Sequence, residues 1–450
     1  MAETVEQQLA RFATAYVLDD DARAMMRLSL YDWTICALAG QGEPVAEILT
    51  RKGRLEGGAP QATIIGGLKL PAPRAALING AISHALDYDD THFDHIGHTS
   101  VAVIPAALAM AQAQGRTMGD FIDAALIGSE AAIRVGTWLG RAHYQVGFHQ
   151  TATSGAFGGA LAGLRLIEAT RPKIIAGLGL AASRASGLKC QFGTMGKPLN
   201  AGLAAEAGVE AALWAQSGLS ASDQGLSGAL GFSETHHGEG IDHAFDGIGA
   251  DWRMKAIKYK FHACCHGLHA MLEALGSLNL TAGQVSQVEI STHPRWMSVC
   301  NNPAPRTGLE AKFSYRQAAA MTLMGIATGR IAAFSDAVAL HPSVSAVAEK
   351  VTVITDDGLT EMQARVVVTH IDGSLQQAFH DLSTTLPHDI LARKLRDKGR
   401  LLIGEGADRV WKAVQGNSLR SYVDVLGMTE PDGWDDSVDL IMEALDYFDI

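Results

Sequence analysis

The sequence has few cysteines, no excess of positive charge and no apolar run long enough to cross a membrane. Its five cysteines, in 450 residues, are an odd number without a CxxC pair, so we expect reduced thiols rather than a disulfide framework. Lys and Arg number 36 against 48 Asp and Glu, a formal net charge of -12 that disfavours nucleic acid as a partner. The most apolar run, residues 101–110, contains a proline and is too short for a bilayer of about 30 Å. We therefore expect no membrane span.

Several common enzyme signatures are also absent. The sequence contains no GxxxxGK[ST], no GxGxxG after a strand, no HExxH and no GxSxG, so nucleotide, dinucleotide and serine-hydrolase chemistry lose most of their support. GEGADR, residues 404–409, begins like a dinucleotide loop, but Arg409 replaces its last glycine. The first residues carry acids and no cationic segment before an apolar stretch, which is unlike a secretory signal. We expect a cytoplasmic protein.

Helical patterning is abundant, above all in the first 230 residues. Apolar residues recur three and four apart in residues 5–16, Asp19 to Asp21 can cap a second helix, and Pro71 suits the first turn of a third. Stretches rich in Ala and Gly, residues 154–166 and 201–215, allow helices to approach closely. These patterns predict a densely packed helical body.

Strand patterning begins after about residue 280. Residues 288–292 alternate, residues 350–355 are rich in β-branched side chains, and Asp372-Gly373 separates two strand-like runs within residues 365–379, which predicts a hairpin. The chain turns helical again near its end. We therefore predict a mainly α protein with a large all-helical domain, residues 1–269 plus 396–450, and a smaller α+β domain, residues 270–395.

The densest polar cluster is HALDYDDTHFDHIGHTS, residues 84–100. If the preceding helix continued through it, four side chains spaced four, three and four apart would share one stripe, namely Asp87, Thr91, Asp94 and His98. Gly97 disfavours a continuous helix, so the same residues can instead converge from a loop. The alternative without function is an exposed helix end with capping and solvated charges.

Two further segments carry single candidates. His149 lies in HYQVGFHQTATSG, residues 143–155, where a half-buried imidazole can exchange protons near neutral pH. Lys197 lies between glycine and proline in FGTMGKPLN, where a constrained turn would present a fixed positive charge to a carboxylate. The alternatives are a satisfied core histidine and an isolated surface lysine.

The fourth segment, residues 258–269, is rich in soft ligands and raises the question of zinc. Its imidazoles and thiols fall in no standard zinc spacing, and four ligands within eight residues rarely surround one ion. We therefore predict no metal site, and expect a strand-to-helix corner in which Lys260, His262 or His269 faces a pocket.

Taken together, these segments resemble the MmgE/PrpD family, which includes 2-methylcitrate dehydratases, cis-aconitate decarboxylases and iminodisuccinate epimerases. The resemblance runs through nearly the whole chain. It rests on five segments in the family's order, which are HALDYDDT with GHTS, GFHQTATSGAFG, FGTMGKPLN, KFHACCHGLH and CNNPAPRTGLEAKFS. It implies a large all-helical domain built from both chain ends, a smaller α+β lid, a homodimer, and neither a metal nor an organic cofactor.

The resemblance also implies site residues, carried over segment by segment: Asp87, Thr91, His98, His149, Lys197, Lys260 and His269. The chain departs from the family pattern at Asn200 and at Gln317, where His and Tyr are frequent, and Tyr315 lies two positions from the second of these. Thr99, where Pro is common, is closer to the epimerase and other MmgE-like members. These departures leave the substrate open.

The expected reaction removes a proton from a carbon next to a carboxylate of a small di- or tricarboxylic acid. Lys197 and Lys260 would hold carboxylates and developing charge. His98 and His149 would act as acid and base, Asp87 would orient an imidazole or act as base, and Thr91, with His262 and His269, would contact the substrate. The residues suit dehydration, decarboxylation and epimerisation alike. The resemblance favours a lyase of dehydratase or decarboxylase type, because the family contains more lyases; an epimerase of a small dicarboxylate and a non-catalytic carboxylate-binding protein remain alternatives.

Overall fold

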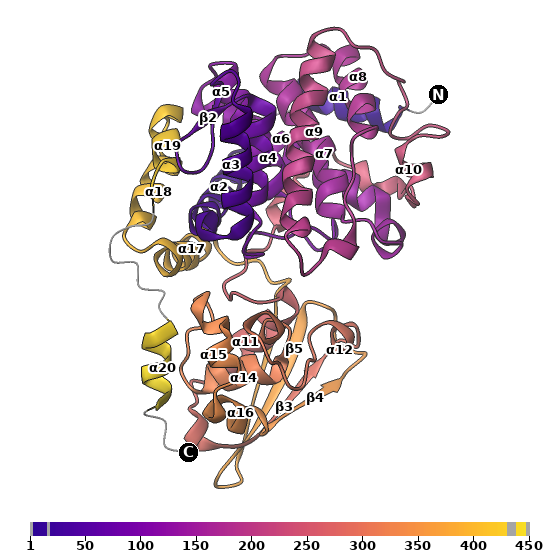
Figure 1. Ribbon diagram of the computed structural model, residues 1–450. Coiled ribbons are helices and arrows are strands. Elements are labelled where there is room, and N and C mark those ends of the chain that lie inside the picture. Colours follow the sequence, from indigo (N-terminus) through magenta and orange to yellow (C-terminus); the bar gives the residue numbers. More distant parts are fainter. Residues whose placement is uncertain (1–2, 16–18, 430–437, 447–450) are drawn as a thin grey trace. The chain divides into compact units, whose positions relative to one another are not determined.

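The computed structural model (Figure 1) describes residues 3–15, 19–429 and 438–446. Contacts between Cα atoms divide the chain into two compact units, the first formed by Met1–Tyr259 and Ile403–Asp432 and the second by Lys260–Leu402 and Gly433–Ile450. None of the described helices combines the length and apolar content that a membrane span requires. The prediction of a mainly α protein with a smaller α+β part is confirmed.

The first unit is a helical body. Its helices are α1 (Val5–Ala15), α2 (Asp20–Ala39), α3 (Pro44–Glu56), α4 (Ala72–Ser83), α5 (Ser100–Ala113), α6 (Met118–Gln145), α7 (Gln150–Leu166), α8 (Arg171–Ala182), α9 (Gly196–Gln216), α10 (Phe232–Thr235), α18 (Gly406–Gln415) and α19 (Leu419–Leu426). The expected helix signals act locally: the Asp19 side chain accepts a 2.7 Å hydrogen bond from the backbone N–H of Ala22, α2 ends at Gly40, and Pro71 precedes α4. A short antiparallel pair of strands, β1 (Ala62–Thr63) and β2 (Lys69–Leu70), also lies in this unit. The unit is therefore not entirely helical, which differs from the prediction of an all-helical domain.

Close approach of glycines fixes the packing of the central helices α4, α5, α6, α7 and α9. A Cβ built on Gly80 would lie 2.9 Å from the Cα of Gly202, which places α4 against α9, and Gly128 meets Gly158 in the same way between α6 and α7. Real Cβ atoms do not approach this closely, so these helices cross nearly backbone to backbone. The expectation that the Ala- and Gly-rich stretches serve close packing is confirmed.

The C-terminal helices α18 and α19 complete the first unit (Figure 1). α18 packs on α2, and the Thr34 hydroxyl lies 2.9 Å from the Tyr422 hydroxyl. The backbone N–H of Gly66 donates to the carbonyl of Leu426 at 2.9 Å. Residues nearly four hundred positions apart thus share one core.

The second unit combines a sheet with short helices. Its elements are α11 (His269–Ser277), β3 (Val285–Thr292), α12 (Arg295–Val299), α13 (Gly308–Ala311), α14 (Tyr315–Leu323), α15 (Asp336–Ala339), α16 (Pro342–Ala348), β4 (Val351–Thr355), β5 (Gln363–His370), β6 (Leu375–Asp381), α17 (His388–Ile403), which runs across the boundary, and α20 (Val438–Asp446). The strand order is β4-β3-β5-β6, with β3 and β4 parallel and the other pairs antiparallel. α11 and α14 pack against this sheet. The predicted hairpin is confirmed, because Thr369 pairs with Leu375 and Gly373 has a φ of 82°.

The two units differ from the expected domain bounds in two respects. The division falls between Tyr259 and Lys260 rather than after residue 269, and near residue 402 rather than 395. In addition, α20 belongs with the second unit, where it contacts α15, and not with the helical body (Figure 1). Its amphipathic spacing indicates a helix with a buried side, but spacing alone does not name the surface it packs against.

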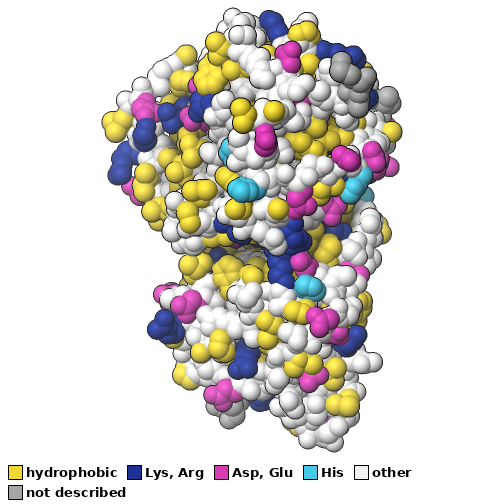
Figure 2. All heavy atoms as spheres, turned by 90° about the vertical axis from the view of Figure 1, so that its right-hand side faces the viewer, with side chains coloured by type: hydrophobic (Ala, Val, Ile, Leu, Met, Phe, Trp, Pro, Cys, Tyr) yellow, Lys and Arg dark blue, Asp and Glu magenta, His cyan; other side chains and the backbone are white. Residues whose placement is uncertain are grey.

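On the second unit, the face drawn in Figure 2 shows acidic, basic and apolar side chains interspersed.

The contact of α4 with α9 yields a stability prediction. A Cβ at position 202 would overlap the carbonyl oxygen of Leu77, which is backbone and cannot rotate away. We expect Gly202→Ala to lower the free energy of unfolding by about 2 kcal/mol, measured by urea denaturation. The matched control is Gly119→Ala in α6, an exposed position where the nearest heavy atom would lie 3.7 Å away, and which should leave stability unchanged or slightly raised. Equal stability of both variants would contradict this packing.

Candidate active site

The candidate site begins in the loop between α4 and α5, residues 84–99, which is not helical. Asp87 and Ile96 have φ values of 52° and 54°, a left-handed backbone that interrupts any helix and that a β-branched residue adopts rarely. Reciprocal backbone hydrogen bonds between His92 and Gly97 close a tight turn. The loop alternative is therefore confirmed, and the single helical stripe is wrong for Asp87, Thr91, Asp94 and His98.

Asp89 lies at the centre of the cluster and is fully buried. One carboxylate oxygen lies 2.9 Å from Nδ1 of His84 and the other lies 2.7 Å from Nδ1 of His98. Burial alone would raise the pKa of Asp89, but the charges and hydrogen bonds of the two histidines outweigh burial and hold this pKa well below its ordinary value. Asp89 is therefore a carboxylate that accepts an N–H from each ring and fixes both imidazoles.

Asp87 and Lys197 lie on the solvent side of this arrangement. The Asp87 carboxylate is 3.3 Å from Nε2 of His98 and 2.7 Å from Nζ of Lys197. Lys197 stands in the first turn of α9 rather than in an isolated turn, and its ammonium is 5.3 Å from the centroid of the Phe192 ring. Its side chain is 16% exposed, so the charge is fixed but within reach of a ligand.

His149 is the N-cap residue of α7 and is 2% exposed. Its ring stacks on His84 with centroids 6.0 Å apart and meets Phe192 edge-on at 5.0 Å. Burial, followed by the charges of His84, Lys197 and His98, holds the pKa of His149 well below its ordinary value, so the ring is neutral. The Asn200 amide nitrogen lies 3.3 Å from both Nδ1 of His149 and the carbonyl oxygen of Leu188. Because an amide NH2 only donates, Nδ1 accepts, and the proton of the neutral ring is on Nε2.

Three helices begin around this cluster. His98 and Thr99 precede α5, His149 precedes α7, and Lys197 lies in the first turn of α9. The backbone N–H of His98 donates to the Thr151 hydroxyl at 3.0 Å, which joins the starts of α5 and α7. Helix N-termini carry partial positive charge, so this end of the body favours a negatively charged ligand.

The structure brings together four of the residues that the sequence singled out: Asp87, His98, His149 and Lys197. Thr91 lies on the same loop, and its backbone pairs with Lys258. Sequence reasoning missed His84 and Asp89, although both stand inside the polar segment of residues 84–100. Their spacing of five residues is compatible with a contact inside one loop, but nothing in the sequence distinguishes Asp89 from its acidic neighbours.

Lys260, His262 and His269 belong to the second unit and form part of a separate cluster there. Lys260 is 3% exposed. Nδ1 of His262 lies 2.6 Å from the Thr328 hydroxyl, and the rings of His262 and His269 are 5.0 Å apart. His269 is buried, and burial followed by the charges of neighbouring histidines and Lys260 holds its pKa well below the ordinary value. The roles of these residues stay predictions.

The two departures from the family pattern have distinct structural roles. Asn200 donates to His149, as described above. Gln317 is buried in α14, and its amide donates to the carbonyl of Val338 at 3.3 Å. Tyr315 is buried too, with its hydroxyl 2.8 Å from both the Thr292 hydroxyl and the carbonyl of Gly267. The Tyr315 hydroxyl is thus committed to the interior of the second unit.

Among the described residues, one set of side chains has a composition that could hold a metal ion: His84, Asp87, Asp89 and His98, with one ligand atom of each within 4.8 Å of the others. Both Nδ1 atoms are already bonded to Asp89, and the ammonium of Lys197 at 2.7 Å from Asp87 would repel a cation. The arrangement therefore suits hydrogen bonding to an anion better than metal coordination. That the protein needs neither a metal nor an organic cofactor stays a prediction.

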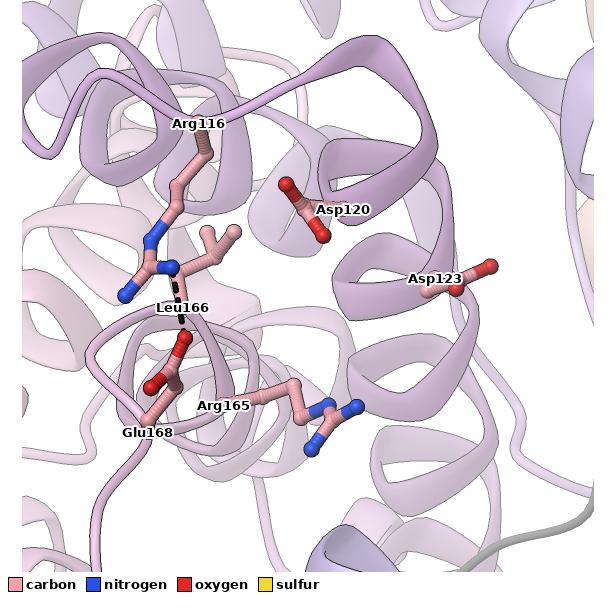
Figure 3. Close-up of a pocket in the computed structure, with 6 residues that line it drawn as sticks. All are labelled: Arg116, Asp120, Asp123, Arg165, Leu166 and Glu168. Carbon is pink, nitrogen blue, oxygen red and sulfur yellow. Dashed lines mark hydrogen bonds and ion pairs between the residues drawn. The ribbon is translucent and has the colours of Figure 1, made fainter.

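A different pocket, of about 170 Å³, lies among α6, the end of α7 and their loops (Figure 3). It is lined by Arg116, Asp120, Asp123, Arg165, Leu166 and Glu168. Figure 3 shows Arg116 and Glu168 directed toward each other, 2.6 Å apart, and Asp123 is held by Arg23 at 2.6 Å. Asp120 caps the start of α6 through Thr117. These charges maintain the fold, and carboxylates outnumber cations, so this pocket is a poor site for an anionic substrate.

The neutral state of His149 is directly measurable. We expect the 15N resonances of its ring to report the neutral Nε2–H form throughout about pH 5 to 8. Asn200→Leu removes the donor to Nδ1 and should change the shift of that nitrogen, whereas the ring 15N shifts of the exposed His243 should be the same in both proteins. A charged ring, or a neutral ring with its proton on Nδ1, would contradict the geometry.

Comparisons with known proteins agree with the resemblance seen in the motifs. The family model described as the MmgE/PrpD N-terminal domain matches residues 7–242, and the one described as the MmgE/PrpD C-terminal domain matches residues 262–412. The chain is 29% identical over 293 residues to a cis-aconitate decarboxylase of Aspergillus terreus, covering 61% of this chain and 60% of that protein.

Two further relatives match over shorter regions. A cis-aconitate decarboxylase of Homo sapiens is 32% identical over 170 residues, 37% of this chain and 35% of that protein. The cis-aconitate decarboxylase-like protein oryM of Aspergillus oryzae is 27% identical over 269 residues, 55% of each chain. The chain thus spans at most about 60% of the length of the curated relatives it matches. Since the first family model alone covers more than half of the sequence, the chain belongs to the MmgE/PrpD family.

Proposed function

We propose that this protein is a cofactor-independent lyase that acts on a small di- or tricarboxylic acid. The observation that carries the proposal is the buried Asp89 carboxylate, which orients His84 and His98 beside the fixed ammonium of Lys197 and the neutral ring of His149. The names of the relatives, cis-aconitate decarboxylases, support a tricarboxylate as substrate and decarboxylation as the reaction.

His98 is the proposed proton carrier. Its Nδ1–H donates to Asp89, so the proton that enters or leaves the ring does so at Nε2, beside Asp87. A carboxylate on Nδ1 orients an imidazole and stabilises the imidazolium that forms when Nε2 takes up a proton. This assigns to Asp89 the orienting role that the sequence analysis gave to Asp87. Asp87 instead becomes a hydrogen-bond partner that both His98 and Lys197 share.

Lys197 and His149 are the proposed donors for substrate oxygens. The ammonium of Lys197 is already paired with one carboxylate, Asp87, at 2.7 Å, and a substrate carboxylate is the same chemical group. The Nε2–H of the neutral His149 is a donor that carries no charge of its own. Fixed donors at a partly buried site stabilise the charge that develops on a carboxylate when an adjacent carbon gains an electron pair.

Both lyase outcomes balance with these groups. In decarboxylation, the C–C bond to a carboxylate breaks, CO2 leaves, and the electron pair left on carbon takes a proton from the His98 imidazolium. In dehydration, a proton from the carbon next to a carboxylate moves to neutral His98, and a hydroxyl leaves with a proton from a second donor. Return of a proton to the opposite face would make the protein an epimerase, which the test below distinguishes.

Further residues are proposed to bind the substrate, and the protein is proposed to form a dimer. Lys260, His262 and His269 are proposed to contact the substrate, and so is Thr91. The protein is also proposed to be a homodimer, as the family resemblance implies. Each of these stays a prediction.

The reaction class can be tested with one set of incubations. The protein is mixed in D2O with citrate, aconitate and succinate derivatives, and NMR follows deuterium incorporation and products. Release of CO2 or water with formation of an unsaturated acid supports the lyase. Exchange with inversion of a stereocentre would replace it with the epimerase, and binding without exchange would replace it with a carboxylate-binding protein.

The role of His98 predicts a large kinetic effect. We expect His98→Asn to lower kcat by about 100- to 10,000-fold with little change in thermal stability, because the asparagine amide can still donate to the buried Asp89 carboxylate but cannot transfer the proton. His243→Gln, a substitution of an exposed histidine in the same unit, is the control. A turnover of His98→Asn within threefold of the wild type would remove His98 from the reaction.

Lys197 predicts a different kinetic signature. Replacing its ammonium with methionine should raise KM about tenfold or more, since a hydrogen bond to a charged group contributes about 1.5–3 kcal/mol. The exposed Lys69, also replaced with methionine, should leave KM unchanged. An unchanged KM in Lys197→Met, measured on the substrate that the NMR screen identifies, would contradict the role in binding.

A further inference from the structure

Asp90, next to Asp89 in the sequence, is fully buried. Its carboxyl bonds to Ser100 at the start of α5, whereas Asp89 bonds to His84 and His98. The backbone N–H of Ser100 lies 3.3 Å from Oδ1, and the Ser100 hydroxyl lies 2.5 Å from Oδ2. A third hydrogen bond comes from the hydroxyl of Ser29 on α2, which is itself 3.0 Å from the Tyr259 hydroxyl.

The charged groups that act most strongly on Asp90 are carboxyls. The stronger charge is that of Asp32 on α2, which is fully buried, and the weaker is that of Asp89, the residue before Asp90 on the loop. Tyr259, a further titratable group at this position, is buried, and its pKa is raised well above the ordinary value, first by burial and then by Asp90, so it is neutral. The hydrogen-bond partners of Asp90 are the neutral hydroxyls of Ser29 and Ser100 and one backbone N–H. A second negative charge is costly in such surroundings.

Burial, followed by the charge of Asp32, raises the pKa of Asp90 to about 7. Asp90 thus differs from Asp89 although the two are adjacent. Asp89 is compensated by two imidazoles and stays ionised, whereas Asp90 faces carboxyls and hydroxyls.

We propose that Asp90 is a positioning residue: as a neutral carboxylic acid it ties the loop of residues 84–99 to α2 and α5, and its ionisation loosens the loop that carries Asp87 and Asp89. Neutral Asp90 donates its proton to one of the two serine hydroxyls and accepts from the other groups. Loss of this proton leaves two buried carboxylates close together, one in helix α2 and one on the loop. The loop has no regular helix to hold it, so it is the segment that can move. The inference rests on the proposed function for its effect on turnover.

The effect on stability follows from the direction of the pKa shift. Unfolded Asp90 ionises near 3.8 and folded Asp90 near 7, so the contribution of this group to stability is complete below about pH 4, falls as the pH rises to 7, and is constant above it. Asp90→Asn has the shape of the protonated form and cannot ionise. The Tm of this variant, minus that of the wild type, should therefore increase from about pH 4 to 7 and then level off.

The decisive experiment compares wild type, Asp90→Asn and the control Asp242→Asn, an exposed position, in Tm and in kcat from about pH 5 to 8.5. Deprotonation of the His98 imidazolium lowers decarboxylation at high pH in both proteins, so we expect the wild-type kcat to fall about tenfold further on the alkaline side than that of Asp90→Asn, a difference that a purely structural role would not produce. Parallel Tm curves and parallel kcat profiles of Asp90→Asn and wild type would overturn the proposal.

Two further cases of the experiment are also decisive. If no substrate is turned over, the proposed function fails while the Tm difference still decides the state of Asp90. If Asp90→Asn does not fold, Asp32→Asn replaces it: removal of the neighbouring carboxylate lowers the pKa of Asp90 in the folded state, so the fall of Tm with rising pH should be smaller than in the wild type and should end at a lower pH. An unchanged pH dependence of Tm in Asp32→Asn would overturn the proposal.

Discussion

The buried carboxylate of Asp89 is the interaction on which the candidate site depends. A fully buried charge is costly unless it is paired and hydrogen-bonded, and Asp89 satisfies this by accepting from His84 and His98 at 2.9 and 2.7 Å. The same two bonds fix the orientation of both rings and the tautomer that each presents. The irregular backbone of the loop, left-handed at Asp87 and Ile96, is maintained because these buried contacts hold it in place.

Close helix packing brings the other groups to this carboxylate. Gly80 near the end of α4 meets Gly202 near the start of α9, so the loop that follows α4 lies beside Lys197 in the first turn of α9. A larger side chain at either glycine would separate the two helices. The site is therefore assembled by the absence of side chains at a helix crossing as much as by the charged residues themselves, and the helix starts gathered there favour an anionic ligand.

The neighbouring acids Asp89 and Asp90 show how environment decides the state of a side chain. One faces imidazoles and is a carboxylate, while the other faces Asp32 and serine hydroxyls and takes up a proton near pH 7. Adjacent residues on an irregular loop point to different sides of it, so one loop serves both a charged and a neutral carboxyl group. The linear sequence, in which Asp87 and Asp94 are further acids of the same segment, contains nothing that separates Asp89 from Asp90.

The sequence by itself determined the fold class, the starts of α1, α2 and α4, the hairpin at Gly373 and four of the residues that meet in the site, because local signals such as caps, spacing and turn residues depend on near neighbours along the chain. Only the tertiary structure decided that Asp89 and His84 lie at the centre, that Asn200 fixes the proton of His149, and that α20 packs in the second unit. These outcomes depend on burial and on partners distant in sequence. The state of a carboxyl or an imidazole follows from what surrounds it in space, and a linear pattern does not contain that information.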